Sequence, residues 1–215
     1  MDMTEWLVRC PIVAILRGIK PEEVIGICTA LEEQGIAIVE VPLNSPDPLR
    51  SIEMLAATFG DRMLVGAGTL TDPKQVAEVA AAGGKLIVTP HADVAVVRAA
   101  KSAGLIAAPG FCNPTEAFAL LQAGADVLKL FPAEVFGIPM LKALHAVLPG
   151  TAGILPVGGV DPTNIAQWLD AGAIGVGAAS SIYKPGDDVR AVERKAKLLV
   201  QAARARTVAA STTAV

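Results

Sequence analysis

Short apolar segments with β-strand character recur eight times along this 215-residue chain, and a helix-like stretch of about 10–15 residues follows each of them. The strand-like segments cover residues 12–16, 36–41, 63–67, 86–88, 105–107, 126–130, 154–157 and 174–177. The helix-like stretches begin near Pro21, Pro46, Asp72, Ala92, Pro114, Gly137, Asp161 and Asp187. Strict alternation of strands and helices predicts a parallel sheet, because parallel strands need a crossover connection.

Eight strand–helix units of roughly 25 residues predict a closed, compact (β/α)8 TIM barrel with a short N-terminal extension. We expect one domain over residues 1–206 and a flexible tail over residues 207–215. An open, doubly wound sheet is the alternative. It is disfavoured because residues 16–20 after the first strand lack the Gly-x-Gly-x-x-Gly pattern of dinucleotide-binding proteins.

The composition excludes several classes of protein. Hydrophobic residues make up 53% of the chain, yet no apolar run approaches the roughly 20 residues that span a membrane, and the first residues lack the positive charge of a secretion signal. The net charge of −3 offers no basic surface to nucleic acid. Cys10, Cys28 and Cys112 lack paired spacing and are typical of reduced thiols in a cytoplasmic protein. His91 and His145 stand in no metal-spaced cluster, so we expect no metal and no other cofactor.

Lys129 interrupts the apolar segment over residues 125–132. Strand alternation puts Val127, Lys129 and Phe131 on one face, and the opposite face is apolar too, so the strand is expected to be buried on both sides. Burial disfavours the ammonium form and lowers the pKa of a lysine, and a neutral amine is the nucleophile that forms a Schiff base. The alternative is that Lys129 is half of a structural ion pair at the strand end.

Polar residues also follow other predicted strands. In a (β/α)8 barrel, reacting groups project from the carboxyl ends of the strands, so we expect Arg17, Glu40, Thr69 and Thr89 to meet Lys129 at one mouth. Alternation pairs three of these residues with barrel-filling side chains, namely Arg17 with Val13 and Ile15, Glu40 with Ile38, and Thr69 with Val65 and Ala67.

Glu40 is the natural partner of Lys129, because imine formation and carbon–carbon cleavage move protons that a carboxylate can accept and return. Arg17 suits a planar partner such as a substrate carboxylate. The alternatives are a buried pair of Glu40 and Lys129 that only fixes the barrel mouth, and a salt bridge from Arg17 to a loop acid.

Small residues dominate the loops after the seventh and eighth strands, at residues 157–160 and 177–180. Loops at these positions commonly hold phosphate in this fold, because glycines let backbone N–H groups approach the phosphate oxygens. A phosphate site is therefore expected in these two loops, which contain Gly158, Gly159, Ala179 and Ser180. A tight turn, which also uses paired glycines, is the alternative.

These strand ends resemble the class I 2-keto-3-deoxy-6-phosphogluconate/2-keto-3-deoxy-6-phosphogalactonate aldolase family. The matching stretches are residues 12–18, 39–46, 65–69, 87–90, 128–132 and 157–160, and the resemblance covers about residues 7 to 205. It implies a Schiff-base lysine at Lys129 and an acid/base glutamate at Glu40. It also implies substrate contacts, which we place at Arg17, Thr69, Thr89 and Pro90, and a phosphate site at Gly158, Gly159 and Ser180.

The residues after Glu40 resemble the galactonate-type branch of that family. The chain has Val41-Pro42-Leu43-Asn44-Ser45, where the gluconate-type enzymes typically have Val-Thr-Leu-Arg-Thr. Asn44 then stands where the other branch has arginine, so carboxylate binding would fall to Arg17. Ala179 departs from the family pattern, because glycine is expected beside the phosphate serine and an added methyl group could tilt or weaken phosphate binding.

The resemblance implies a retro-aldol lyase that cleaves 2-dehydro-3-deoxy-6-phosphogalactonate to pyruvate and D-glyceraldehyde 3-phosphate, and it implies a homotrimer. Activity on 2-keto-3-deoxy-6-phosphogluconate or 2-keto-4-hydroxyglutarate at the same site is the nearest alternative. Two further alternatives are a barrel that performs metal-assisted decarboxylation or phosphate-group chemistry, and a phosphate-binding barrel without catalysis.

Overall fold

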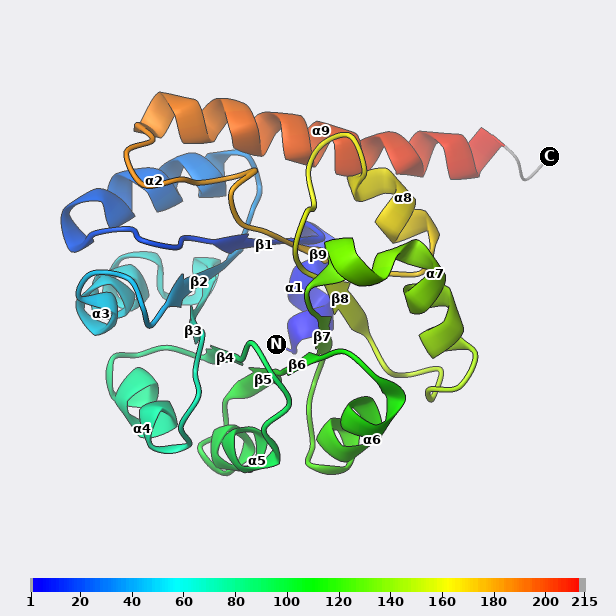
Figure 1. Cartoon of the computed structure of the whole chain (residues 1–215). Coiled ribbons are helices and arrows are strands. Elements are labelled where there is room, and N and C mark those ends of the chain that lie inside the picture. Colours follow the sequence, from blue (N-terminus) through cyan, green and yellow to red (C-terminus); the bar gives the residue numbers. More distant parts are fainter. Residues whose placement is uncertain (1, 213–215) are drawn as a thin grey trace.

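The computed structural model describes residues 2–212, with side chains through residue 205. Strands paired in parallel lie at the centre, and helices α2–α9 surround them (Figure 1). The strands are β1 (Ile12–Ile15), β2 (Ile38–Pro42), β3 (Leu64–Gly68), β4 (Leu86–Val88), β5 (Ile106–Ala108), β6 (Gly110–Phe111), β7 (Leu128–Leu130), β8 (Ile154–Pro156) and β9 (Val176–Ala178). All except β6 have bounds within two residues of a predicted segment, because short apolar runs between glycine and proline signals define them well.

The strands form two parallel sheets, and the expectation of a closed (β/α)8 barrel is wrong. Six strands pair in the order β5-β4-β3-β2-β1-β9, and three pair in the order β6-β7-β8. Pro109 has no N–H to donate and separates β5, the fifth predicted strand, from β6, which was not predicted. Within residues 2–212, no continuous strand pairing joins β8 to β9. An isolated bridge from Val157 to Gly177 and a hydrogen bond from the Ile174 N–H to the Ile154 carbonyl link the two regions.

The helices that follow the strands begin close to the predicted positions. They are α2 (Pro21–Glu33), α3 (Pro48–Phe59), α4 (Lys74–Ala81), α5 (Val94–Ser102), α6 (Pro114–Gln122), α7 (Ala133–His145), α8 (Ile165–Asp170) and α9 (Val189–Thr212), and a short 3-10 turn covers Gly60–Arg62. Asn113 shows why such starts can be predicted: its side chain accepts the Glu116 N–H while Pro114 occupies the first turn of α6. No helix within residues 2–212 has the length and apolar character that a bilayer crossing requires.

Two helical features differ from the sequence prediction, and a third concerns the predicted tail. Helix α1 (Met3–Arg9) forms in the expected N-terminal extension, where Asp2 and Glu5 make a capping box. Helix α7 starts ahead of Gly137, which instead forms a kink with a φ of 69°. Helix α9 continues to Thr212, and residues 213–215 lie outside the described part of the chain, so the flexible tail stays a prediction.

Strand alternation sorts the buried side chains into two cores. The inner core contains Val13, Ile15, Ile38, Leu64, Leu86, Val88, Ala108, Val127, Leu155 and Val157. Met3, Trp6 and Leu7 of α1 pack into the same inner core. Because α1 immediately precedes β1, it covers the amino ends of the strands, and the carboxyl ends remain available for a site.

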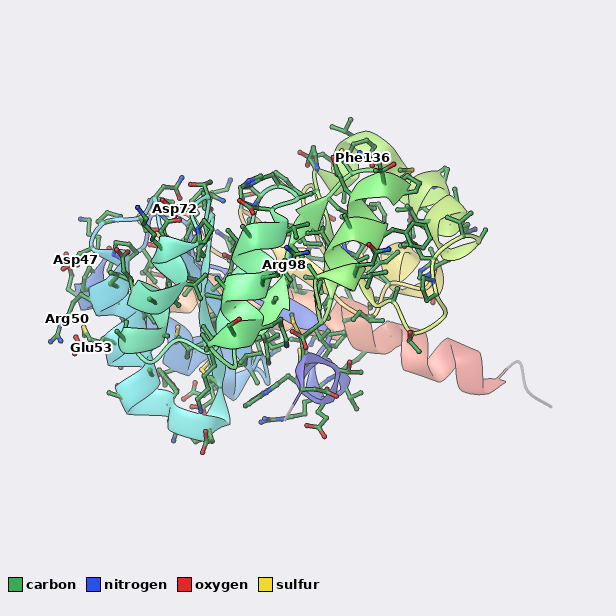
Figure 2. All side chains as sticks on the ribbon, turned by 90° about the horizontal axis from the view of Figure 1, so that it is seen from below. Asp47, Arg50, Glu53, Asp72, Arg98 and Phe136 are labelled. Carbon is green, nitrogen blue, oxygen red and sulfur yellow. The ribbon has the colours of Figure 1, made fainter. Side chains whose placement is uncertain are left out.

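The carboxyl ends of the strands share one face of the molecule. Asp72 follows β3 and Phe136 follows β7, and both labels lie along the upper side of Figure 2. Side chains from strands that are distant in the sequence therefore meet at this face, as expected of parallel strands wound in one direction.

Candidate active site

Lys129 lies in β7 and Glu40 lies in β2, and their side chains are buried, with exposed fractions of 5% and 2%. Each continues an inward-facing row, because Val127 and Ile38, two residues earlier, belong to the inner core. The strand faces predicted for these two residues are confirmed. Two oppositely charged residue types thus reach the inner face of the strands from separate sheets.

Lys129 and Glu40 influence each other without an ion pair among the described side chains. Oε2 of Glu40 is buried and has no hydrogen-bond partner. Nζ of Lys129 lies 5.0 Å from the centre of the Phe131 ring, within range of a cation–π contact. A purely structural ion pair would require direct contact, whereas this arrangement leaves both groups able to engage a ligand.

The pKa values of both groups are displaced toward their neutral forms. Burial lowers the pKa of the Lys129 amine, Glu40 opposes this shift, and the Arg17 cation adds to it. Burial also raises the pKa of the Glu40 carboxyl, while the nearby charges of Lys129 and Arg17 hold it down in part. The site therefore combines an amine that loses its proton more readily than an ordinary lysine with a carboxyl that keeps its proton more readily than an ordinary glutamate.

Gly68 at the end of β3 makes room for the Glu40 carboxyl group. A Cβ atom at Gly68 would lie 1.2 Å from Oε2 of Glu40, so no larger residue fits without displacing that carboxylate. Gly68 belongs to the stretch of residues 65–69 that resembles the aldolase family, but the sequence did not predict that Gly68 supports Glu40. Only the packing of β3 beside β2 reveals it.

Arg17 lies just after β1, and its side chain is exposed at the carboxyl ends of the strands. Nη1 of Arg17 donates to Oδ1 of Asn44 at 2.8 Å. Within the described residues no salt bridge joins Arg17 to an acid, so the alternative of a loop salt bridge is not found. Because Asn44 is uncharged, the guanidinium keeps its positive charge available for a planar anion.

A pocket of about 390 Å³ opens beside Arg17. It brings together all four residues of the predicted phosphate site. The complete lining is Arg17, Gly18, Glu134, Gly158, Gly159, Ala179, Ser180, Tyr183, Lys184 and Pro185. Gly158 and Gly159 have φ values of 110° and 66°, which favour glycine and turn the backbone toward this pocket wall.

The remaining predicted contacts lie on β3 and β4. Val65 and Ala67 pack in the helix-facing core, so the face predicted for Thr69 differs from the structure. Thr69 itself has a φ of 63°, and this left-handed conformation ends the regular alternation of β3. Thr69 does not line the pocket beside Arg17.

Thr89 is buried at the end of β4, and its Oγ1 accepts the N–H of Gly110 at 3.0 Å. Gly110 pairs with Lys129 across β6 and β7, so Thr89 helps to fix the strand beside the lysine. Pro90 is half-buried, and a Cβ atom on Gly110 would lie 2.7 Å from its carbonyl carbon. The structure thus places Thr89 and Pro90 next to β6, which pairs with the Lys129 strand, and their contact with substrate stays a prediction.

Sequence reasoning missed five residues of the pocket, which are Gly18, Glu134, Tyr183, Lys184 and Pro185. Glu134 lies in the first turn of α7, directly after the Lys129 strand, and Tyr183 and Lys184 follow the predicted phosphate serine. In the sequence, the only sign of a role in the site is that these residues follow strand ends. That sign does not identify the pocket residues, because the loop backbone determines which side chains enter the pocket.

Within residues 2–212, no cluster of three or more His, Cys, Asp or Glu side chains could hold a metal ion. The described cysteines Cys10, Cys28 and Cys112 are free thiols. The expectation that the chain uses no metal or other cofactor stays a prediction.

Comparison with known proteins identifies the relatives of this site. The sequence profile of the KDPG and KHG aldolases (2-keto-3-deoxy-6-phosphogluconate and 2-keto-4-hydroxyglutarate aldolases) matches residues 3–194. The 2-dehydro-3-deoxy-6-phosphogalactonate aldolase of Escherichia coli (strain K12) is 44% identical over 200 residues, which cover 93% of this chain and 98% of the relative.

Solved structures agree with this relationship. A structure described as native KDPGal superimposes with a TM-score of 0.91 at 43% identity, and covers 93% of this chain and 97% of its own. A KDPG aldolase from Legionella pneumophila, with pyruvate captured as a covalent carbinolamine, superimposes with a TM-score of 0.81 at 28% identity, over 95% and 98% of the two chains. The chain therefore belongs to the KDPG and KHG aldolase family.

Proposed function

We propose that this chain is a class I aldolase that cleaves 2-dehydro-3-deoxy-6-phosphogalactonate to pyruvate and D-glyceraldehyde 3-phosphate. The observation that carries the proposal is the buried, unpaired Lys129, whose pKa is lowered, near a buried and equally unpaired Glu40. Such a pair supplies the nucleophile and the proton carrier that Schiff-base chemistry needs. The similarity to the Escherichia coli enzyme of that name supports the choice of substrate.

In the first half of the reaction, the neutral Nζ of Lys129 attacks the C2 carbonyl carbon of the substrate. Glu40 transfers protons as the resulting carbinolamine loses water and becomes a protonated imine. The raised pKa of Glu40 suits this role, because its carboxyl group can carry a proton at a pH where an exposed glutamate is fully ionised.

In the second half, the Glu40 carboxylate accepts the proton of the C4 hydroxyl group while the C3–C4 bond breaks. The bonding electrons move into the protonated imine, which becomes an enamine, and D-glyceraldehyde 3-phosphate leaves. Protonation of the enamine at C3 and hydrolysis of the imine release pyruvate and restore the Lys129 amine. The imine is the electron sink, so this sequence needs no metal ion.

The substrate would lie between two anion-binding ends. Arg17, which is held by Asn44, binds the carboxylate at C1, and the loops that carry Gly158, Gly159 and Ser180 hold the 6-phosphate. Thr69, Thr89 and Pro90 complete the substrate contacts in this proposal. Thr89 and Pro90 also support the strand beside Lys129.

The test compares pyruvate release from the two C4-epimeric phosphorylated substrates, with Lys129→Ala as the inactive control. We expect the galactonate-series substrate to react faster by roughly tenfold or more, since a site that hydrogen-bonds one hydroxyl orientation discriminates strongly against the other. A faster reaction of the gluconate-series substrate contradicts the substrate assignment. Absence of pyruvate from both, or loss of activity on treatment with EDTA, contradicts the metal-free aldolase mechanism.

We further propose that the chain assembles as a homotrimer and acts in the cytoplasm. The apolar share of 53% and the exposed apolar side chains, among them Val135 at 72% exposure, support self-association. Free cysteines fit a reducing compartment.

A further inference from the structure

The pocket beside Arg17 contains a second cation, which the sequence did not single out. We propose that Lys184 determines specificity for the phosphate group: its ammonium binds the 6-phosphate dianion and thereby favours phosphorylated over unphosphorylated substrate. This inference rests on the proposed function, which places the phosphate in this pocket.

The backbone around Lys184 is anchored by both neighbours and by the loop that follows. Tyr183 is buried, and its hydroxyl group donates to Oε2 of Glu23 at 3.0 Å. Pro185 packs closely against Gly18, because a Cβ atom at Gly18 would lie only 2.7 Å from Cγ of Pro185. The Lys184 N–H donates to Oδ2 of Asp187 at 2.7 Å. The backbone of Lys184 is therefore fixed at the pocket edge. Less conformational entropy is then lost when its side chain binds a ligand.

The charge of Lys184 is available to a ligand. Among the described residues, its ammonium group makes no hydrogen bond or ion pair. It acts electrostatically on Asp187, but that carboxylate already forms an ion pair with Lys195. A lysine with a fixed backbone and an unpaired ammonium group can form charge-assisted hydrogen bonds with phosphate oxygens.

The other charges of the pocket make such a cation necessary. Arg17 also lines this pocket, but it is bound to Asn44 and holds the C1 carboxylate in the proposed function. The carboxylate of Glu134 lies close to Gly159, because a Cβ atom at Gly159 would be 2.5 Å from Oε2 of Glu134. A phosphate group carries between about 1.5 and 2 negative charges at pH 7, and Glu134 repels it. Lys184 offsets that repulsion.

Ala179, which also lines the pocket, increases the need for a cation there. Its methyl group keeps a ligand farther from the backbone N–H groups than a glycine would. The loop after β9 thus offers less backbone binding and, four residues beyond Ser180, a long cationic side chain. Lys184 takes over part of the phosphate recognition that a glycine-rich loop would provide.

The experiment measures kcat/KM on 2-dehydro-3-deoxy-6-phosphogalactonate and on its unphosphorylated analogue for the wild type and for Lys184→Gln, Lys184→Arg and Lys142→Gln. Lys142 is an exposed lysine on α7 outside the pocket and serves as the matched control. We expect Lys184→Gln to lose roughly tenfold on the phosphorylated substrate alone, Lys184→Arg to retain most of the activity, and the control to behave as wild type.

Equal losses on both substrates, or no loss on either, would overturn the proposal. Binding of inorganic phosphate, followed by 31P line broadening, separates this inference from the proposed function, because it needs no turnover. Weaker phosphate binding in Lys184→Gln supports the role of Lys184 even if the wild type cleaves neither substrate. Unchanged phosphate binding in that variant overturns it.

Discussion

At the scale of single residues, the site depends on two buried ionisable groups that do not neutralise each other by contact. Burial is the largest cause of the displaced pKa of both Lys129 and Glu40. Removing charges from water without a direct partner costs stability, and such unfavourable groups persist where their reactivity is needed. The apolar strands around Lys129 and Glu40 therefore shift the pKa values that suit these residues to their roles as nucleophile and proton carrier.

Glu40→Gln should stabilise the protein increasingly as the pH rises. Since burial raises the pKa of Glu40 above its ordinary value of 4.5, the carboxyl group contributes stability below that pH and loses it as the pH rises through the raised value. Glutamine does not titrate, so the variant avoids this loss. We expect a gain of about 1–3 kcal/mol in the free energy of unfolding at neutral pH, measured by chemical denaturation, and a smaller gain at acid pH.

The exposed Glu78, changed to glutamine, is the control for this measurement and should show no such pH dependence. A Glu40→Gln variant that is less stable than the wild type by the same amount at every pH would contradict the assigned shift.

At the scale of secondary-structure elements, the strands beside Glu40 and Lys129 fix the positions of these two residues. β3 supports Glu40 through Gly68, and β6, held by Thr89 at Gly110, lies beside Lys129. The sequence predicted the strands and the inward direction of Lys129 and Glu40, because both follow from apolar runs and a two-residue period. It could not predict the support by Gly68, because that depends on which strand packs beside β2.

Gly68→Ala should remove most of the activity by displacing the Glu40 carboxylate from β3. Loss of a general acid/base typically costs 10²–10⁴ in rate, so we expect kcat to fall by about 100-fold or more, with Lys129 still present. Steady-state pyruvate release and thermal unfolding measure the two effects. Gly150→Ala is the matched control, since a Cβ atom at Gly150 meets no atom within 4 Å. Activity of Gly68→Ala close to that of the wild type would show that Glu40 needs no such support.

At the scale of the whole molecule, two sheets enclose one inner core and bring their carboxyl ends to a common face (Figures 1 and 2). The sequence predicted the order of strands and helices and their parallel pairing, but not the breaks that divide the strands into two sheets. Pro109 is visible in the sequence, yet its effect on strand pairing depends on contacts with β4 and β7, which lie far away along the chain. Loop conformations such as the φ of 63° at Thr69 escaped prediction for a related reason, because they are imposed by surrounding structure.

The assembly state can be measured on the intact protein. Sedimentation equilibrium should give a mass three times the 22.0 kDa of one chain, because the exposed apolar side chains would be buried between subunits. A mass equal to that of one chain at all concentrations would contradict the proposed trimer and leave the chemistry of Lys129 unaffected.

The most direct test of the catalytic role of Lys129 is covalent trapping with pyruvate. The protein is incubated with pyruvate and borohydride, the intact chain is weighed, and the adduct is mapped, with Lys129→Ala as the control. The account predicts one stable pyruvyl adduct, located on Lys129 and absent from the variant, because a neutral amine at this position forms an imine that borohydride reduces. A folded protein that forms no adduct, or one that carries the adduct on another lysine, would contradict it.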